Sequence, residues 1–385
     1  MEFGFDEEQI LYRDVIRRFA LEKLLPNYQK WDREGGYLSR QQLHELGDLG
    51  ILGLRVPEEY GGQAASFVNC GIATEELSRG DFNYNYFVQL FAIAAELLGG
   101  YAEEPLKREW LPKIASGDAV MGFALTEPGA GSDAANIQTR AIRDGDEYRI
   151  SGEKASISFA GFADAAVVFA RVGDQPGARG IGSFLVPLDD KGVTRQVYRS
   201  PGEKLAGRGS LFFDEVRIPV SNRIGDERGG FIAAMVAFDF NRAIIGLGCV
   251  GTALQSLEET IEYVKQRQAF GRPLAKFEGV SFQIAEHLTM IHAARHLCYE
   301  TLWLKDQGRP HTKQASMAKL LAPRAAAEAV HTCLLLHGHA GYNLDAPFDQ
   351  RWRDIVGLEI GDGTAEVMKL VIVREMLGRE FLPYR

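Results

Sequence analysis

The segments AAVVFARV (residues 165–172), GSFLVPL (182–188) and SLFFDEVRIP (210–219) decide the fold class of this chain. Each segment is a short run of β-branched, aromatic and other apolar residues, and clusters of Gly, Asp and Pro separate them. Together with EYRISGEKASIS (147–158), they predict an antiparallel barrel or sandwich rather than a doubly wound sheet. The sequence contains no strand–GxGxxG–helix unit and no GxxxxGK[ST] motif, so it does not support a Rossmann or P-loop site.

Helical patterns flank the β-rich segment on both sides. On the N-terminal side, apolar residues recur every four positions from Leu11, Asp6 and Gln9 resemble a capping box, and Pro26 ends the run. Further helices are predicted over residues 39–49, 66–78, 83–98, 231–248, 252–268, 277–307, 311–337 and 364–379. Long amphipathic helices usually pack as bundles. The prediction is therefore an α+β fold, mainly α, with a helical domain over residues 1–118, an antiparallel β-barrel over 119–225 and a helical bundle over 226–385.

Composition narrows the class of protein further. The chain has 385 residues, with 43 Lys and Arg against 52 Asp and Glu, and the resulting net charge of −9 disfavours nonspecific nucleic-acid binding. Its 4 cysteines lack CxxC or His-rich spacing, so we expect neither a disulfide framework nor a metal site. The acidic start and the lack of an uninterrupted apolar segment of spanning length predict a cytoplasmic protein with no membrane span.

Two glycine-containing motifs carry groups suited to a phosphorylated ligand. In TEPGAGSD (126–133), glycines let backbone N–H groups approach a ligand, and Thr126 and Ser132 add hydroxyls. In RQAFG (267–271), the Arg267 guanidinium matches phosphate oxygens. A plain turn and a helix C-cap are the simpler interpretations of the two motifs.

Three further motifs also have simple structural interpretations. FDFNR (238–242) places Asp239 and Arg242 three apart on a helix, where they can form a local ion pair. LHGHAGY (336–342) has two histidines, but no further ligand is spaced to complete a metal site, which favours a helix-ending turn. LEIGDGTAEVMK (358–369) places Asp362 between glycines just before a helix, a position typical of an N-cap.

The order of the motifs is more specific than any one of them. TEPGAGSD, FDEVRIPVSNRIG (213–225), RQAFGRPLAKFEGVSFQIAE (267–286) and RDIVGLEIGDGTAEVMKLVIVRE (353–375) together resemble the acyl-CoA dehydrogenase family of flavoproteins. The likeness runs from VPEEYGG (56–62) to the last helix. It implies an N-terminal helical domain, a middle β-barrel, a C-terminal four-helix bundle, and a homotetramer with FAD bound across a subunit boundary. It also implies an acyl-CoA substrate and an electron-transferring flavoprotein as acceptor.

The same resemblance implies roles for individual residues. Asp362 would be the catalytic base that takes the proton next to the thioester carbonyl, while hydride leaves the β-carbon for flavin N5. The backbone N–H of the base would help to stabilise the carbonyl oxygen. Contacts to the cofactor would come from Phe123, Leu125, Thr126, Gly131, Ser132, Ser156, Ser158, Arg267, Phe270, Gly271, His337, Gly338, Thr364 and Glu366. Contacts to the substrate would come from Gln89, Phe91, Ser132, Phe238, Asp239, Asn241, Arg242, Gly361 and Gly363.

Three departures from the family pattern bear on the substrate. The family base is usually a glutamate in a Tyr-Glu-Gly-Thr-like segment, and here Asp362 is shorter by one methylene. Gly361 replaces an aromatic residue and Ser156 replaces the common tryptophan, and both changes vacate volume. The three changes together predict a wide, short pocket. Because reacting groups tolerate little misplacement, a linear acyl chain would lie too far from the shorter base. Since an aspartate base resembles the alicyclic acyl-CoA dehydrogenases, we expect oxidation of cyclohexane-1-carboxyl-CoA to cyclohex-1-ene-1-carboxyl-CoA.

Several alternatives stay open at this point. A 1,4-dehydrogenation of the cyclohexene thioester to a diene would need an acid near the far side of the ring, and the expected pocket helix offers Gln89, Leu90 and Phe91 instead. A short branched-chain acyl-CoA is a second possible substrate. Glu359 is a rival base, whereas Asn241, at the position where some family members carry the base, cannot serve. The remaining alternatives are a homologue that binds FAD and acyl-CoA without catalysis, and an oxidase.

Overall fold

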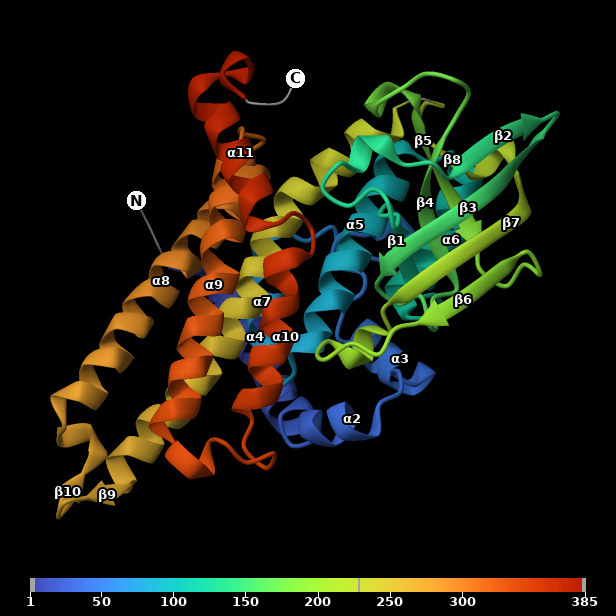
Figure 1. Cartoon of the computed structure of the whole chain (residues 1–385). Helices are drawn as coiled ribbons and strands as arrows, with labels where there is room; N and C mark the ends of the chain where they lie inside the picture. Colours follow the sequence, from blue (N-terminus) through green and yellow to red (C-terminus); the bar gives the residue numbers. More distant parts are fainter. Residues whose placement is uncertain (1–3, 228, 383–385) are drawn as a thin grey trace.

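The β-sheet and the long C-terminal helices occupy opposite sides of the molecule, and N-terminal helices fill the space between them (Figure 1). This computed structural model describes residues 4–227 and 229–382. The N-terminal helices are α1 (Glu7–Phe19), α2 (Tyr28–Glu34), α3 (Arg40–Asp48), α4 (Phe67–Gly80), α5 (Asn85–Tyr101) and α6 (Glu104–Ser116). The predicted capping box is confirmed, since Gln9 N donates to Asp6 Oδ1 at 2.8 Å and Asp6 N donates to Gln9 Oε1 at 3.2 Å.

The middle region is a sheet of short strands. Its members are β1 (Met121–Ala124), β2 (Arg140–Asp144), β3 (Glu147–Ile157), β4 (Ala165–Arg171), β5 (Ile181–Pro187), β6 (Val193–Val197), β7 (Gly209–Pro219) and β8 (Arg223–Ile224). The strand order is β6-β7-β3-β2-β4-β5-β8, and β1 pairs with β4. Strands β4 and β5 are buried along nearly their whole length, which explains their continuous apolar sequences.

Two parts of the barrel prediction are wrong. Among the described residues no pairing joins β6 to β8, so the sheet stays open between two short edge strands. The sheet is also mixed rather than antiparallel throughout, because β4 runs parallel to both β1 and β2. The sequence pattern identifies strands and their buried faces, but closure depends on pairings between distant segments that the pattern does not encode.

The C-terminal helices are α7 (Gly230–Gln266), α8 (Glu278–Asp306), α9 (Thr312–Leu336), α10 (Phe348–Ile360) and α11 (Ala365–Leu377). The two helices predicted over residues 231–248 and 252–268 form a single helix, α7. Its internal glycines mark close packing rather than an end, since a Cβ on Gly251 would lie 2.0 Å from the carbonyl oxygen of Glu75. The sequence pattern does not predict helix α10. Its buried side includes the charged residues Arg351 and Asp354, which interrupt the apolar periodicity that marks a helix.

Helix α7 also bears on the membrane prediction. It contains an 18-residue window with a mean hydropathy of 1.5, which is long and apolar enough to cross a membrane. Most of that window is buried inside the protein, and α7 packs against α4, α8 and α9. Its apolar character is therefore that of a core helix.

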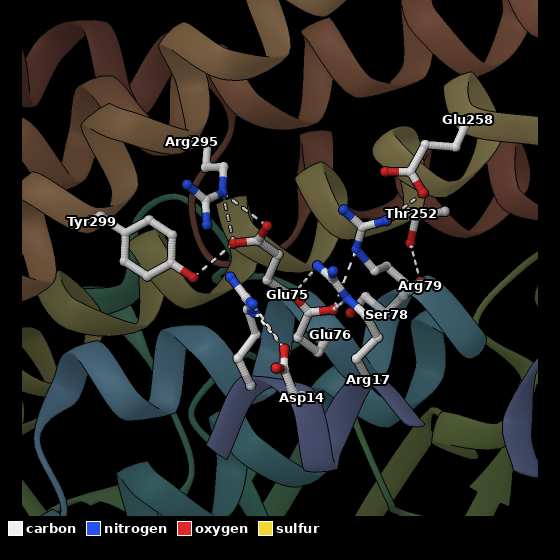
Figure 2. Close-up of polar contacts among 11 residues, drawn as sticks. Asp14, Arg17, Glu75, Glu76, Ser78, Arg79, Thr252, Glu258, Arg295 and Tyr299 are labelled. Carbon is white, nitrogen blue, oxygen red and sulfur yellow. Dashed lines mark hydrogen bonds and ion pairs between the residues drawn. The ribbon is translucent and has the colours of Figure 1, made fainter. Parts of the chain in front are cut away.

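Ion pairs between buried carboxylates and partly exposed arginines tie helix α4 to its neighbours, as Figure 2 shows. Arg17 on α1 forms two hydrogen bonds of 2.7 Å with Glu76 on α4. Arg295 on α8 lies 2.8 Å from Glu75, which also accepts a hydrogen bond of 2.7 Å from the Tyr299 hydroxyl. We call these five residues the α4 seam, and they join the N-terminal helices to the C-terminal bundle.

Candidate active site

Asp362 lies in the turn that connects α10 to α11. Its φ of +55° places it in the left-handed backbone region, which aspartate tolerates better than most residues. Gly363 follows with a φ of +105°, and a Cβ there would lie 2.5 Å from the Met368 Cε atom. Thr364 is the N-cap of α11, since its side chain accepts a hydrogen bond from Val367 N. The interpretation of Asp362 as an N-cap is therefore wrong, and its carboxylate is left free for another role.

A buried lysine holds the same turn from helix α9. The Lys319 side chain is only 3% exposed. Its Nζ atom donates to the carbonyl oxygen of Leu358 at 2.5 Å and to that of Gly363 at 3.2 Å. These two carbonyls lie on either side of Asp362 in the chain, so the lysine bridges the turn.

The Asp362 carboxylate has few partners of its own. Asn241 Nδ2 donates to Asp362 Oδ2 at the long distance of 3.5 Å. Among the described residues no cation lies within ion-pair distance of this carboxylate. Burial raises the pKa of Asp362 above its ordinary value of 3.8, and the positive charges of Lys319, Arg208 and Arg242 offset part of that rise. A buried carboxylate with a raised pKa is suited to general-base chemistry.

Helix α7 carries the predicted substrate residues beside this turn. The local ion pair is confirmed, since Arg242 Nη1 lies 2.7 Å from Asp239 Oδ1. Asp239 Oδ2 also accepts a hydrogen bond of 2.5 Å from Thr312 Oγ1. Within the described chain, Arg242 Nε and Asn241 Oδ1 are buried atoms without a hydrogen-bond partner. Buried polar atoms without a partner are uncommon in proteins, and these two atoms beside Asp362 indicate a place for a ligand.

A second buried acid near Asp362 is missing from the sequence prediction. Glu203, in the loop between β6 and β7, accepts hydrogen bonds from the Tyr86 hydroxyl at 2.5 Å and from Arg208 Nη2 at 2.6 Å. A Cβ on Gly357 would lie 2.7 Å from Glu203 Oε1, so a side chain at position 357 would displace this carboxylate. Burial raises the pKa of Glu203, and the negative charge of Asp362 raises it further. The signal in the sequence is the loop SPGEKLAGRGS (200–210), whose paired opposite charges lie among glycines.

The predicted cofactor residues of the β-region lie together. Ala155 N donates to the carbonyl oxygen of Thr126 at 2.8 Å, which places the TEPGAGSD segment alongside the strand that carries Ser156. The fully buried Lys154 reinforces this junction, since its Nζ donates to the Leu125 carbonyl at 2.9 Å. Lys154 also pairs with Glu127 at 2.8 Å, and burial lowers its pKa to about 8. TEPGAGSD itself forms a turn, in which residues Glu127 and Ala130 pair.

The cofactor and substrate sets meet where the sheet touches α7. The rings of Phe123 on β1 and Phe238 on α7 are 5.3 Å apart between centroids. On α5, Gln89 is 1% exposed and its Oε1 atom is without a hydrogen-bond partner in the described chain, whereas Phe91 is fully buried against Phe87. Gly361, Ser132 and Gly131 are more accessible to solvent, as is Ser156, with a φ of +57°.

The remaining predicted cofactor residues lie on the C-terminal helices and their connections, and only Thr364 and Glu366 are close to Asp362 in the chain. Arg267, Phe270 and Gly271 belong to the hairpin of β9 (Gln268–Ala269) and β10 (Arg272–Pro273), at the end of the bundle remote from the sheet (Figure 1). The Phe270 side chain is 96% exposed. His337 and Gly338 follow α9, and the His337 ring stacks on Tyr263 at 4.0 Å. Thr364 is used as a helix cap, and Glu366 pairs with Lys369 at 3.5 Å.

The structure also bears on metal and disulfide chemistry. The described residues contain no group of three His, Cys, Asp or Glu side chains that could hold a metal ion. All 4 cysteines are free and buried.

Comparisons with known proteins agree with this arrangement. Models of the N-terminal, middle and C-terminal domains of acyl-CoA dehydrogenases match residues 6–118, 122–216 and 228–377. The chain is 35% identical over 384 residues to the probable acyl-CoA dehydrogenase YngJ of Bacillus subtilis, covering 98% of this chain and 100% of that protein. It is 34% identical over 374 residues to the short-chain-specific acyl-CoA dehydrogenase of Clostridium acetobutylicum, covering 97% and 98%.

A solved structure extends the likeness to the fold. The butyryl-CoA dehydrogenase of Megasphaera elsdenii superposes with a TM-score of 0.92 at 31% identity, covering 98% of this chain and 100% of the other. The protein belongs to the acyl-CoA dehydrogenase family and is an FAD-dependent oxidoreductase.

Proposed function

We propose that this enzyme dehydrogenates a compact cyclic acyl-CoA, converting cyclohexane-1-carboxyl-CoA to cyclohex-1-ene-1-carboxyl-CoA, with Asp362 as the base. The observation that carries the proposal is the Asp362 carboxylate itself. It is held on a strained turn, has one long hydrogen bond to Asn241, and has a raised pKa because it is buried. A carboxylate that was only structural would have its oxygens paired.

The surrounding residues support proton abstraction at the carbon next to the thioester carbonyl. Asp362 would accept that proton on its carboxylate, and the Asn241 amide would orient the carboxylate. The developing negative charge on the carbonyl oxygen needs a donor. In the described chain the Asp362 N–H donates to no protein acceptor, so it is available for that oxygen.

The residues present fit FAD on the sheet side of the site. The Thr126 and Ser132 hydroxyls are accessible, and a Cβ added at Gly129 or Gly131 would meet open space. These glycines and the accessible hydroxyls can approach phosphate or ring atoms closely. Bound FAD would supply the two-electron acceptor for the hydride that leaves the β-carbon as the double bond forms.

The short reach of aspartate and the small residues at positions 361 and 156 are the basis for preferring a ring to a linear chain. Aspartate reaches one methylene less than the usual glutamate, so the α-carbon must approach the turn more closely. Gly361 provides room, since a Cβ there would make only ordinary contacts, the nearest at 3.5 Å to Leu358 Cδ2. Ser156 adds volume on the sheet side. The short-chain and butyryl-type relatives make a short linear or branched acyl-CoA the competing substrate.

Glu203 favours a second candidate reaction, the 1,4-dehydrogenation of cyclohex-1-ene-1-carboxyl-CoA to a diene. That reaction needs an acid on the far side of the ring. Helix α5 offers none at Gln89 or Phe91, but Glu203 is buried near enough to Asp362 for the two charges to interact. Its ion pair with Arg208 weighs against free proton transfer, so the monoene remains the preferred product.

Two partners complete the proposal. We propose an electron-transferring flavoprotein as acceptor, by resemblance to the family. We also propose a homotetramer, in which the hairpin that carries Arg267 and the exposed Phe270 would contact FAD held by a neighbouring subunit.

An anaerobic absorbance titration tests the substrate. The yellow holoenzyme is mixed in parallel with cyclohexane-1-carboxyl-CoA, cyclohex-1-ene-1-carboxyl-CoA, isobutyryl-CoA and butyryl-CoA, and the products are identified by mass spectrometry. The proposal expects bleaching by the cyclohexane thioester with the monoene as product. Bleaching only by the cyclohexene thioester would support the diene reaction. Bleaching only by the acyclic thioesters would show that the substrate is not cyclic.

A further inference from the structure

Lys319 is placed to control the turn that presents Asp362. Among the described residues, Lys154 and Lys319 are the two lysines that are buried, at 0% and 3% exposure. Lys319 directs its ammonium to two main-chain carbonyls, those of Leu358 in the last turn of α10 and Gly363 just after Asp362. It does not form an ion pair with the Asp362 carboxylate, since no such contact within 4.0 Å exists in the described chain.

The Leu358 carbonyl needs a donor from outside its own helix. The last carbonyls of an α-helix have no intrahelical partner, and a cation is favourable at that end because of the helix dipole. Helix α10 ends at Ile360, and the chain then turns through the left-handed conformation of Asp362. A non-glycine residue is strained in that conformation, so the turn needs contacts that hold it.

The charges around Asp362 come from several elements. Lys319 on α9, Arg208 in the β6–β7 loop and Arg242 on α7 are the positive groups. Glu203 in the β6–β7 loop and Tyr86 on α5 are the titratable acids that respond to Asp362. Arg208 is already paired with Glu203 at 2.6 Å, and Arg242 with Asp239 at 2.7 Å.

Among the described residues, Lys319 is therefore the positive neighbour of Asp362 without a carboxylate partner, since its hydrogen bonds go to carbonyls. Burial lowers the pKa of the Lys319 ammonium below its ordinary value, while Asp362, Cys249 on α7 and Glu359 on α10 raise it and Arg242 lowers it further.

We propose that Lys319 is a positioning residue for the dehydrogenation, holding the Asp362 turn by its carbonyls and supplying the charge that keeps the buried carboxylate ionised. The proposal rests on the proposed function, because it requires Asp362 to be the base. It separates two contributions of one side chain. The hydrogen bonds fix the geometry of the turn, and the charge sets the pH at which the base becomes active.

Three holoenzyme variants separate these contributions. Lys319→Met removes both the donors and the charge, whereas Lys319→Gln removes the charge and keeps an N–H donor. Lys154→Met is the matched control, because it removes the other buried lysine, which does not act on Asp362. The readout is the rate of flavin reduction by the accepted thioester, measured anaerobically across a range of pH.

Both Lys319 variants should shift the acidic limb of the pH–rate profile to higher pH by about 1 unit, the size expected for a nearby opposite charge. The plateau rate of Lys319→Met should fall by about 10- to 100-fold, because a displaced base loses its alignment. Lys319→Gln should retain more of the plateau rate. Lys154→Met should keep the wild-type limb, even if the β-region binds FAD more weakly.

Two results would overturn the proposal. One is a pH–rate profile whose acidic limb is the same as in wild type for both Lys319 variants. The other is a shift of that limb in Lys154→Met as large as the shift in the Lys319 variants. If Lys319→Met does not fold, Lys319→Gln alone decides the charge contribution. Asp362→Asn, measured in parallel, tests the underlying function separately. Undiminished bleaching by this variant would show that Asp362 is not the base. Abolished bleaching by Asp362→Asn, together with unshifted pH–rate profiles in the Lys319 variants, would reject only the role of Lys319.

Discussion

The α4 seam and the Asp362 turn both bury carboxylates near arginines, but they leave those carboxylates in different states. In the seam, Glu75 and Glu76 accept hydrogen bonds on all of their carboxylate oxygens, at 2.7–2.9 Å (Figure 2). At the turn, the Asp362 carboxylate accepts a single hydrogen bond within the described part of the chain, at 3.5 Å. Saturated charges hold helices together, whereas an unsaturated buried charge is available for chemistry.

Removing the Asp362 charge should have the largest effect. Asp362→Asn should keep the protein yellow and lower the rate of flavin bleaching by about 10²- to 10⁴-fold, the range of a general base. Stopped-flow absorbance with cyclohexane-1-carboxyl-CoA measures the rate. A near-wild-type rate would mean that Glu359 or another group takes the proton.

Breaking the seam should affect stability rather than chemistry. Arg295→Met leaves Glu75 with only Tyr299 and should lower the free energy of unfolding by about 3 kcal/mol. That value is at the low end for a buried pair because the Arg295 side chain keeps 22% exposure. The bleaching rate per folded enzyme should not change.

The exposed pair on α9 provides the control for this prediction. Arg324 and Glu328 lie 3.0 Å apart with side-chain exposures of 73% and 57%, so solvent screens the pair and Arg324→Met should leave the free energy of unfolding nearly unchanged. Urea unfolding compares the variants. Equal losses in both would show that the seam is no stronger than a surface ion pair.

Lengthening the base tests the pocket shape. Asp362→Glu restores the reach of the common family base, so it should lower turnover of the cyclic thioester by about tenfold through misalignment. Turnover of butyryl-CoA should rise relative to that of the cyclic substrate. A clear gain with the cyclic substrate would contradict the steric argument for a ring.

The smallest predicted effect concerns stability as a function of pH. Because burial raises the pKa of folded Asp362 above 3.8, the folded state holds its proton to higher pH than the unfolded chain does. Wild-type stability therefore includes a contribution that is lost as pH rises through the raised pKa. Asp362→Asn lacks this loss and should gain stability relative to wild type as pH rises from acid to neutral. An unchanged difference across that range would mean that Asp362 is not desolvated.

Local signals predicted much of the fold. Asp6 and Gln9 mark a helix start by direct contact between near neighbours, and the runs over 165–172 and 182–188 have the uniform apolar character of buried strands. Sheet closure and the continuity of α7 depend on packing between distant segments. Gly251 illustrates this, since only its contact with α4 distinguishes a packing glycine from a helix end.

The candidate site was predictable from the sequence where its residues lie in one motif. Asp362 stands out between glycines, and Asn241 and Arg242 are found together because they share a helix. Lys319 and Glu203 were missed because their roles depend on partners far along the chain, 44 residues away for Lys319 and Gly363 and 117 for Tyr86 and Glu203. Lys319 has no motif of its own, and the only local signal for Glu203 is its place among the charges and glycines of the loop over residues 200–210.

Exchange of the substrate α-hydrogen with solvent tests the assignment of Asp362 most directly, because it reports proton removal separately from oxidation. Wild type and Asp362→Asn holoenzymes are incubated anaerobically in D₂O with cyclohexane-1-carboxyl-CoA, and deuterium in the recovered thioester is measured by mass spectrometry. We predict deuterium at the α-carbon with wild type and none above background with Asp362→Asn. Equal incorporation by the two proteins would contradict the central claim, because the proton would then leave to a group other than Asp362.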